Sequence, residues 1–216
     1  MSTVDHHDHD HGHDHGHHEP IEDAAQSLHY RALERAVREL LIEKGMFGAD
    51  DVRRQIDDQD SRGEAQGARL VARAWADPAY KARLLADAKP AATELGVNVA
   101  VAPELVVVEN TAEVHHVVVC TLCSCYPKAI LGIPPAWYKS REYRSRVVRE
   151  PRAVLREFGT ELPEDVEVRV VDSTADMRYL VLPRRPPGTE GWDEARLAAL
   201  VSRDSMIGVA PARGPS

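Results

Sequence analysis

The chain has 216 residues, with 35 acidic and 27 basic side chains and a formal net charge of −8, a length that suits one domain with an appendage or two small domains. Residues 1–23 hold seven of the acids and no Lys or Arg, so the rest of the chain is nearly neutral, with 28 acids against 27 bases. This balance argues against a nucleic-acid-binding protein, and the absence of a long apolar run or an export signal argues against a membrane protein.

Residues 1–22 are a segment of mostly His, Asp and Gly that carries eight of the eleven histidines. The segment has too few apolar side chains to offset the entropy lost on ordering, so we expect a disordered tail. Imidazole binds several transition metals, and the tail could therefore gather metal. The alternative is an inert, solubilising tail.

Residues 23–96 are expected to form a helical arm. Apolar residues recur at helical spacing in Gln26–Lys44, and a second helix is predicted over Glu64–Ala76. An Asp-Pro pair ending at Pro78 predicts the start of a third helix, which Pro90 should kink or split. Because these helices are rich in Ala and Arg and have few large side chains, we expect the arm to lie on a partner subunit.

Residues 97–216 are expected to form a layered α/β body that carries the metal-binding and catalytic site. Four apolar runs predict strands: Glu104–Glu109, Val114–Val119, Val166–Val171 and Arg178–Leu182. Three further segments predict helices: Ser140–Arg149, Pro151–Phe158 and Asp193–Arg203. The expected fold class is therefore α+β, with the helical arm first and the layered body after it.

The three cysteines of the chain, Cys120, Cys123 and Cys125, all fall within six residues. A disulfide framework would scatter them, so the cluster indicates a metal or redox site. A structural zinc site needs four ligands, and His115 and His116 precede the cluster on an expected strand whose alternate residues face opposite ways. A redox pair would be expected at a helix N-terminus, and copper delivery through the Cys-Ser-Cys pair is a further option.

The remaining interpretation is a metal-binding loop that surrounds one ion with several of its own atoms, which we call the claw. Three sulfurs converge from one short loop, and the backbone amides of Ser124 and Cys125 lie between them. If these amides lose their protons, five ligands come from six residues and leave a sixth octahedral position for water or substrate. Such an anionic ligand set suits trivalent cobalt or iron better than zinc, and the open position would act as a Lewis-acid site.

Three segments carry a resemblance to a known family. Residues 117–127 read VVVCTLCSCYP, residues 131–139 read LGIPPAWYK and residues 143–152 read YRSRVVREPR. Together they closely resemble the catalytic α subunit of nitrile hydratases, and the similarity extends over most of the chain. In that family, Thr at the position of Thr121 and Tyr at the position of Tyr126 mark the cobalt type. The resemblance therefore implies Co(III), with Fe(III) as the alternative.

The resemblance implies a role for each residue of the claw. Cys120 would be the axial thiolate, Cys123 and Cys125 would be oxidised to sulfinate and sulfenate, and Ser124 and Cys125 would supply amide nitrogens. The implied reaction is hydration of a nitrile to an amide, with Cys123, Ser124 and Cys125 as the catalytic residues. The nucleophile would be a hydroxide or the sulfenate oxygen of Cys125.

The resemblance also implies a partner. The β subunit of the family supplies arginines to the oxidised cysteines, so we expect a cytoplasmic αβ heterodimer or (αβ)2 assembly that is inactive without its partner. The local residues Arg144 and Arg149 are alternative cationic partners of these cysteines, but we expect them to form interface contacts and surface salt bridges instead.

One departure from the family pattern concerns the substrate. Nitrile hydratases usually carry Trp-Pro after the Tyr-Pro pair, whereas this chain has Lys128 and Ala129. An ammonium near a pocket lined by Tyr126 and Lys128 would favour an anion or a polar substrate. This feature resembles the γ subunit of thiocyanate hydrolase, which has two smaller partner subunits and converts thiocyanate to carbonyl sulfide and ammonia. A third hypothesis, a cobalt carrier, conflicts with the kinetic inertness of amide-bound Co(III).

Overall fold

The computed structural model describes residues 24–100 and 102–215. The expected tail at residues 1–22 lies outside this range. The chain divides between Arg54 and Gln55 into two compact units. No helix within the described ranges is long and apolar enough to cross a membrane.

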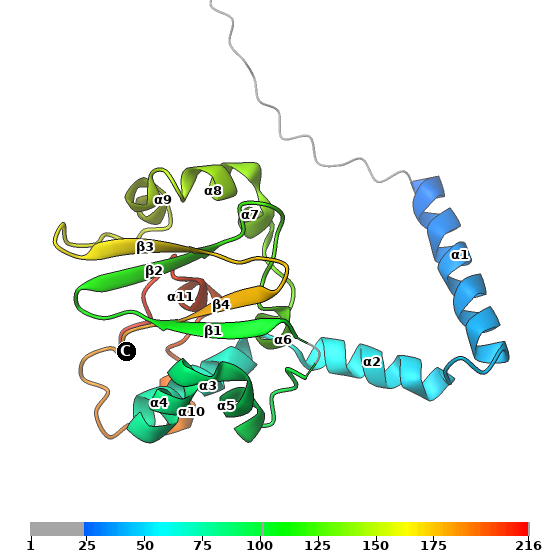
Figure 1. Ribbon diagram of the computed structural model, residues 1–216, viewed down its shortest axis with the longest axis horizontal. Coiled ribbons are helices and arrows are strands. Elements are labelled where there is room, and N and C mark those ends of the chain that lie inside the picture. The colour runs from blue at the N-terminus through cyan, green and yellow to red at the C-terminus, as the bar shows by residue number, and fades with distance from the viewer. Residues whose placement is uncertain (1–23, 101, 216) are drawn as a thin grey trace, which may run out of the picture. The chain divides into compact units, whose positions relative to one another are not determined.

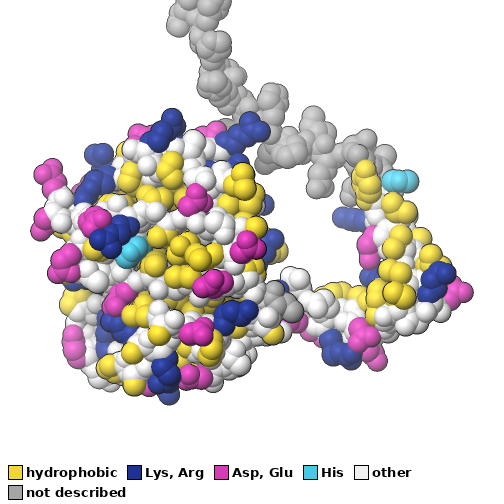
Figure 2. Space-filling model, viewed as in Figure 1, with side chains coloured by type: hydrophobic (Ala, Val, Ile, Leu, Met, Phe, Trp, Pro, Cys, Tyr) yellow, Lys and Arg dark blue, Asp and Glu magenta, His cyan; other side chains and the backbone are white. Residues whose placement is uncertain are grey.

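The first unit contains α1 (Ala24–Glu43) and the start of α2 (Ala49–Ser61). Helix α1 matches the helix expected at Gln26–Lys44, whereas α2 was not among the expected elements. Leu33, Val37 and Leu40 of α1 lie on one stripe and are exposed by 51%, 47% and 48%, and Leu28 is 67% exposed on another side of the helix. Figure 2 shows hydrophobic side chains along this helix. Within its own unit, α1 therefore has an uncovered apolar face.

The second unit begins with three helices, α3 (Glu64–Ala76), α4 (Pro78–Ala86) and α5 (Ala88–Glu94). Asp77 caps α4, because its Oδ1 accepts hydrogen bonds from the amides of Ala79 (2.9 Å) and Tyr80 (3.1 Å). The expected split of the third helix occurs at Asp87, which places Pro90 in the first turn of α5. A helix needs no amide proton there, so the chain accommodates Pro90 by starting a new helix just before it.

These helices share one hydrophobic core with the strands. Leu70 and Leu84 are buried in it, and Tyr80 is buried with its hydroxyl donating to the carbonyl of Ala91 at 3.0 Å. Trp75 packs against the same core and donates from Nε1 to the carbonyl of Pro183 at 2.8 Å. The boundary expected between residues 96 and 97 therefore falls inside this second unit.

The strands form two parallel pairs. Strand β1 (Glu104–Glu109) pairs with β4 (Met177–Leu182), and β2 (Val114–Val119) pairs with β3 (Glu167–Asp172). Each lies within one residue of a strand predicted from sequence. Figure 1 shows the two pairs layered between α3, α4 and α5 below and α7, α8 and α9 above.

Short helices complete the unit. They are α6 (Lys128–Leu131), α7 (Ala136–Lys139), α8 (Arg141–Arg146), α9 (Pro151–Glu157), α10 (Glu194–Ala198) and α11 (Arg203–Ile207). Ser140 caps α8 by accepting a hydrogen bond from the amide of Tyr143 at 3.1 Å. Helix α8 falls within the expected helix at 140–149, while α6, α7 and α11 are additional.

Gly208 ends α11 in a crowded place beside β2. Its φ of +86° lies in the left-handed region, and a Cβ built there would stand 2.0 Å from the carbonyl oxygen of His116. Its own carbonyl accepts a hydrogen bond from Nε2 of buried His115 at 2.7 Å. A side chain at this position would therefore push α11 away from β2.

We predict that Gly208→Ala lowers the free energy of unfolding by at least ~3 kcal/mol, because it adds backbone strain and a clash with backbone atoms. Gly191→Ala is the matched control, since Gly191 also has a positive φ (+75°) but no neighbour within 4 Å of a built Cβ. This control should lose only about 1 kcal/mol. Urea unfolding measures both, and equal losses would contradict the proposed crowding.

Candidate metal centre

The cysteine loop begins where β2 ends. In the parallel pair, Val119 of β2 lies opposite Asp172, the last residue of β3, so both strands finish at the same edge. The carboxylate of Asp172 accepts two hydrogen bonds from Thr121, one from its amide at 3.0 Å and one from its hydroxyl at 2.5 Å. The strand pairing therefore fixes the first residues of the loop.

The loop brings the three cysteine sulfurs together. The Sγ atoms of Cys120 and Cys123 are 3.4 Å apart, those of Cys123 and Cys125 are 3.2 Å apart, and all three lie within 4.8 Å of one another. Cys120 is buried, Cys125 is half-buried and Cys123 is exposed. Three soft donors thus converge on one point that is open on the side of Cys123.

Backbone amides also face this point. The amide of Cys123 donates to the sulfur of Cys120 at 3.3 Å. Hydrogen bonds from the thiols of Cys125 and Cys120, and then from the amides of Ser124 and Cys125, lower the pKa of Cys123 to about 7. Burial, followed by the contact with Cys123, raises the pKa of Cys125 to about 12. In the loop without metal, Cys123 is therefore the first of these two thiols to ionise.

The carbonyl groups of the loop point to other parts of the unit. The guanidinium of Arg144 donates to the carbonyl of Cys123 at 2.7 Å, and the hydroxyl of Tyr138 donates to the carbonyl of Cys125 at 2.8 Å. The expected interface contacts of Arg144 stay a prediction, and within this chain its guanidinium contacts the loop. Arg149 is exposed and donates to the carbonyl of Ser145 at 3.0 Å.

An aromatic cluster supports the loop. Tyr126 is buried, and its ring packs edge-on against Tyr138 with centroids 5.0 Å apart. Trp137 makes similar contacts with Tyr143 at 4.9 Å and with Phe158 at 4.8 Å. The hydroxyl of Tyr143 donates to the carbonyl of Val118 at 2.7 Å, in the strand that leads into the loop. These rings give the loop a rigid base.

Tyr126 and Lys128, the residues expected in a substrate pocket, line one cavity of about 180 Å³. Lys128 is exposed at the start of α6. Two other cations line the cavity, but Arg62 is paired with Asp58, and Arg178 donates to the carbonyls of nearby residues in its own segment. No cysteine lines this cavity, so it adjoins the loop without including the sulfur cluster.

His115 and His116 lie outside the group of cysteine ligands. The side-chain oxygen of Asn110 accepts a hydrogen bond from the amide of His116 at 2.7 Å. The side-chain nitrogen of Asn110 therefore donates to Nδ1 of His115, at 3.2 Å. His115 therefore donates from Nε2 to Gly208, and burial lowers its pKa and keeps the ring neutral. His115 is therefore a core residue and not a metal ligand of the cysteine cluster.

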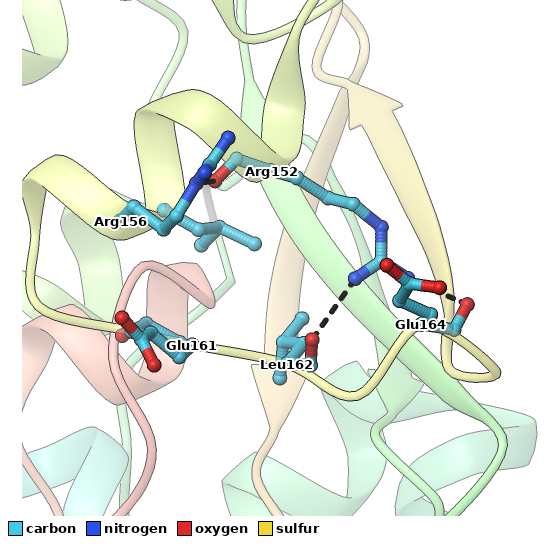
Figure 3. A pocket seen from close by; sticks show the side chains of 7 residues that line it. Arg152, Arg156, Glu161, Leu162 and Glu164 are labelled. Atoms are coloured by element: carbon cyan, nitrogen blue, oxygen red, sulfur yellow. Dashed lines mark hydrogen bonds between the residues drawn. The ribbon is translucent and has the colours of Figure 1, made fainter.

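Figure 3 shows a separate pocket of about 350 Å³ beside α9. Arg152 donates from this helix to the carbonyls of Leu162 (3.2 Å) and Pro163 (3.1 Å), and also to those of Glu164 and Val166. These hydrogen bonds hold the loop that leads to β3 against α9. No cysteine lines the pocket, and we give it a structural role.

Sequence reasoning did not foresee the contacts by which three residues hold the loop: Tyr138, Arg144 and Asp172. A signal existed for Asp172, because a polar residue at the end of a strand parallel to β2 must lie near the loop. Tyr138 and Arg144 belong to the segments that resembled nitrile hydratases, but their contacts depend on how α7 and α8 fold back over the loop.

Comparisons with known proteins agree with this site. A family model described as nitrile hydratase, alpha chain, matches residues 28–210. The cobalt-containing nitrile hydratase subunit alpha of Pseudonocardia thermophila is 51% identical over 181 residues, which are 83% of this chain and 89% of the relative. The thiocyanate hydrolase subunit gamma of Thiobacillus thioparus is 49% identical over 192 residues, 84% of this chain and 79% of the relative.

A solved structure shares the fold. It is a double mutant of the Fe-type nitrile hydratase from Comamonas testosteroni Ni1, with a TM-score of 0.78 and 43% identity over 90% of this chain and 93% of that chain. The family thus includes relatives named for cobalt and for iron, and one named for thiocyanate. From its cysteine loop, its fold and these similarities, the chain belongs to the nitrile hydratase α-chain family.

Proposed function

We propose that this chain is the catalytic subunit of a cobalt-dependent nitrile hydratase, which adds water to a nitrile and yields the amide. The observation that carries the proposal is the sulfur cluster of Cys120, Cys123 and Cys125, whose atoms lie within 4.8 Å of one another on one loop. The similarity to a relative named as a cobalt-containing nitrile hydratase subunit supports this function.

The residues of the loop fit a trivalent metal. Three thiolates together with the amide nitrogens of Ser124 and Cys125, once these have lost their protons, would form an anionic set of five donors, which suits a trivalent cation. A structural zinc site needs four Cys or His ligands, and among the described residues the cluster offers three. Thr121 and Tyr126 favour cobalt over iron through the family resemblance. When bound, the metal would act as a Lewis acid toward the nitrile.

The residues of this chain would prepare the site. We place Cys120 on the buried side of the metal, and Cys123 and Cys125 toward the substrate, oxidised to sulfinate and sulfenate. Leu122 is 88% exposed beside Cys123, so the substrate side of the loop is open within this chain. Asp172, Tyr138 and Arg144 would hold the backbone while the cysteine side chains remain free for the metal.

A β subunit is the proposed partner. The exposed apolar stripe of α1 and the exposed side chains of Leu122 and Ile133 (80%) would be covered by that subunit in an αβ heterodimer or (αβ)2 assembly. The same subunit would bring arginines to the oxidised cysteines, whose negative charge needs cationic partners. We propose that the assembled enzyme works in the cytoplasm.

The test is to express the chain with its β subunit in cobalt medium and to give the purified complex an aliphatic nitrile and thiocyanate in parallel. The proposal expects the amide from the nitrile and no carbonyl sulfide from thiocyanate. The apo complex, prepared without cobalt, is the control and should be inactive. Carbonyl sulfide with ammonia as the only products would contradict the nitrile hydratase function.

Lys128 favours a second candidate, thiocyanate hydrolase. Its exposed ammonium lines the cavity beside the loop, where the other two cations are engaged by Asp58 and by backbone carbonyls. A cation at this place would attract a small anion such as thiocyanate much more strongly than a neutral aliphatic nitrile. The relative named thiocyanate hydrolase subunit gamma supports this candidate.

A charge variant separates the two candidates. If thiocyanate is the substrate, Lys128→Leu should raise its KM roughly fivefold to tenfold, because the variant removes an attractive charge from the cavity. If a neutral nitrile is the substrate, the same variant should change its KM by less than about twofold. Lys139→Leu is the control, since Lys139 is also exposed but does not line the cavity. An unchanged KM for thiocyanate would rule out this role of Lys128.

A further inference from the structure

Arg144 donates hydrogen bonds to the backbone of the cysteine loop and is not part of the sulfur cluster. Its Nη1 donates to the carbonyl oxygen of Cys123 at 2.7 Å and makes a longer contact of 3.5 Å with that of Thr121. Its Nε donates to the carbonyl of Ser140 at 3.3 Å, at the start of α8. The half-buried side chain of Arg144 thus connects Ser140, the N-cap of α8, to the middle of the loop.

The carbonyl that Arg144 contacts shares a peptide group with the amide of Ser124. A peptide group is planar, and in the trans form its C=O and N–H point in opposite directions. No peptide bond among the described residues is cis. Since Arg144 holds the oxygen, the N–H of Ser124 must point the other way, away from the guanidinium. The contact with Arg144 therefore sets the direction of the Ser124 nitrogen, which lies between Cys123 and Cys125 in the loop that brings the three sulfurs together.

Little else orients this peptide group. Cys123 is exposed and Ser124 is half-buried, so packing holds it weakly. The other two contacts act on different peptide groups, because Asp172 accepts from the amide of Thr121 and Tyr138 donates to the carbonyl of Cys125. If the contact with Arg144 were lost, this part of the loop could rotate and turn the amide of Ser124 away from the sulfurs.

We propose that Arg144 is a positioning residue for the metal centre, which aims the backbone nitrogen of Ser124 at the metal by holding the carbonyl of Cys123. This inference rests on the proposed function and adds a residue to it. A backbone nitrogen that binds a metal shares negative charge with the carbonyl oxygen of its peptide group. A guanidinium at that oxygen offsets the charge better than a neutral donor, because charge-assisted hydrogen bonds are stronger.

The neighbouring arginines do not share this task. Arg146 pairs with Glu150 and Glu157, and Arg149 is exposed and donates to the carbonyl of Ser145. Arg149→Gln is therefore a matched control, since it removes the same charge five residues away without touching the loop. Arg144→Gln removes the charge at the loop, and Arg144→Lys keeps a cation but loses the planar fork.

The experiment loads each variant, in complex with the β subunit, with cobalt and follows the sulfur-to-cobalt charge-transfer absorption during a challenge with EDTA. We expect Arg144→Gln to shift the absorption band and to release cobalt at least tenfold faster than wild type. Arg144→Lys should release cobalt at an intermediate rate, and Arg149→Gln should match wild type. Thermal unfolding of each apo complex shows whether the variants fold.

Two results would overturn the inference. One is an Arg144→Gln complex with the band and the cobalt release rate of wild type. The other, if Arg144→Gln fails to fold, is a folded Arg144→Lys complex that matches wild type in both readouts. Failure of the proposed function is distinguishable, because the wild-type complex would then show no sulfur-to-cobalt band at all.

Discussion

The parallel pairing of β2 with β3 is the constraint on which the candidate metal centre depends. It ends both strands at one edge, so that Asp172 lies opposite Val119 and accepts two hydrogen bonds from Thr121. Because Cys120 follows β2 directly and is buried, its position is fixed by the same pairing. The loop therefore leaves the sheet in one direction, and its remaining residues close over a point that the sheet edge defines.

Beyond Cys120, the loop is held through its backbone. Arg144 and Tyr138 donate to carbonyl groups of Cys123 and Cys125, and the aromatic cluster under Tyr126 supports the far end of the loop. This arrangement leaves all three cysteines free of disulfide bonds. A rigid backbone with free thiols is what a claw for a trivalent metal requires.

Much of this could be predicted from sequence, because the signals are local. Apolar runs predicted the four strands to within one residue, and the spacing of the cysteines predicted the sulfur cluster. Contacts between distant segments carry no such signal. The role of Arg144 depends on the fold of α8 over the loop, and a helix such as α2 has no strong apolar stripe. Residues 64–96 were expected in an arm because they have few large side chains, yet the absence of a side chain at Gly67 lets α3 pack closely against Leu131 and Met206.

The central claim is that the loop binds cobalt through three sulfurs and two backbone nitrogens. X-ray absorption at the cobalt edge of the complex with its β subunit tests it most directly, because it counts sulfur and nitrogen neighbours of the metal. We expect three sulfur neighbours, with lighter nitrogen or oxygen atoms completing the shell. A shell of lighter atoms with the multiple scattering of imidazole, and without sulfur, would place the cobalt on histidines instead and contradict the account.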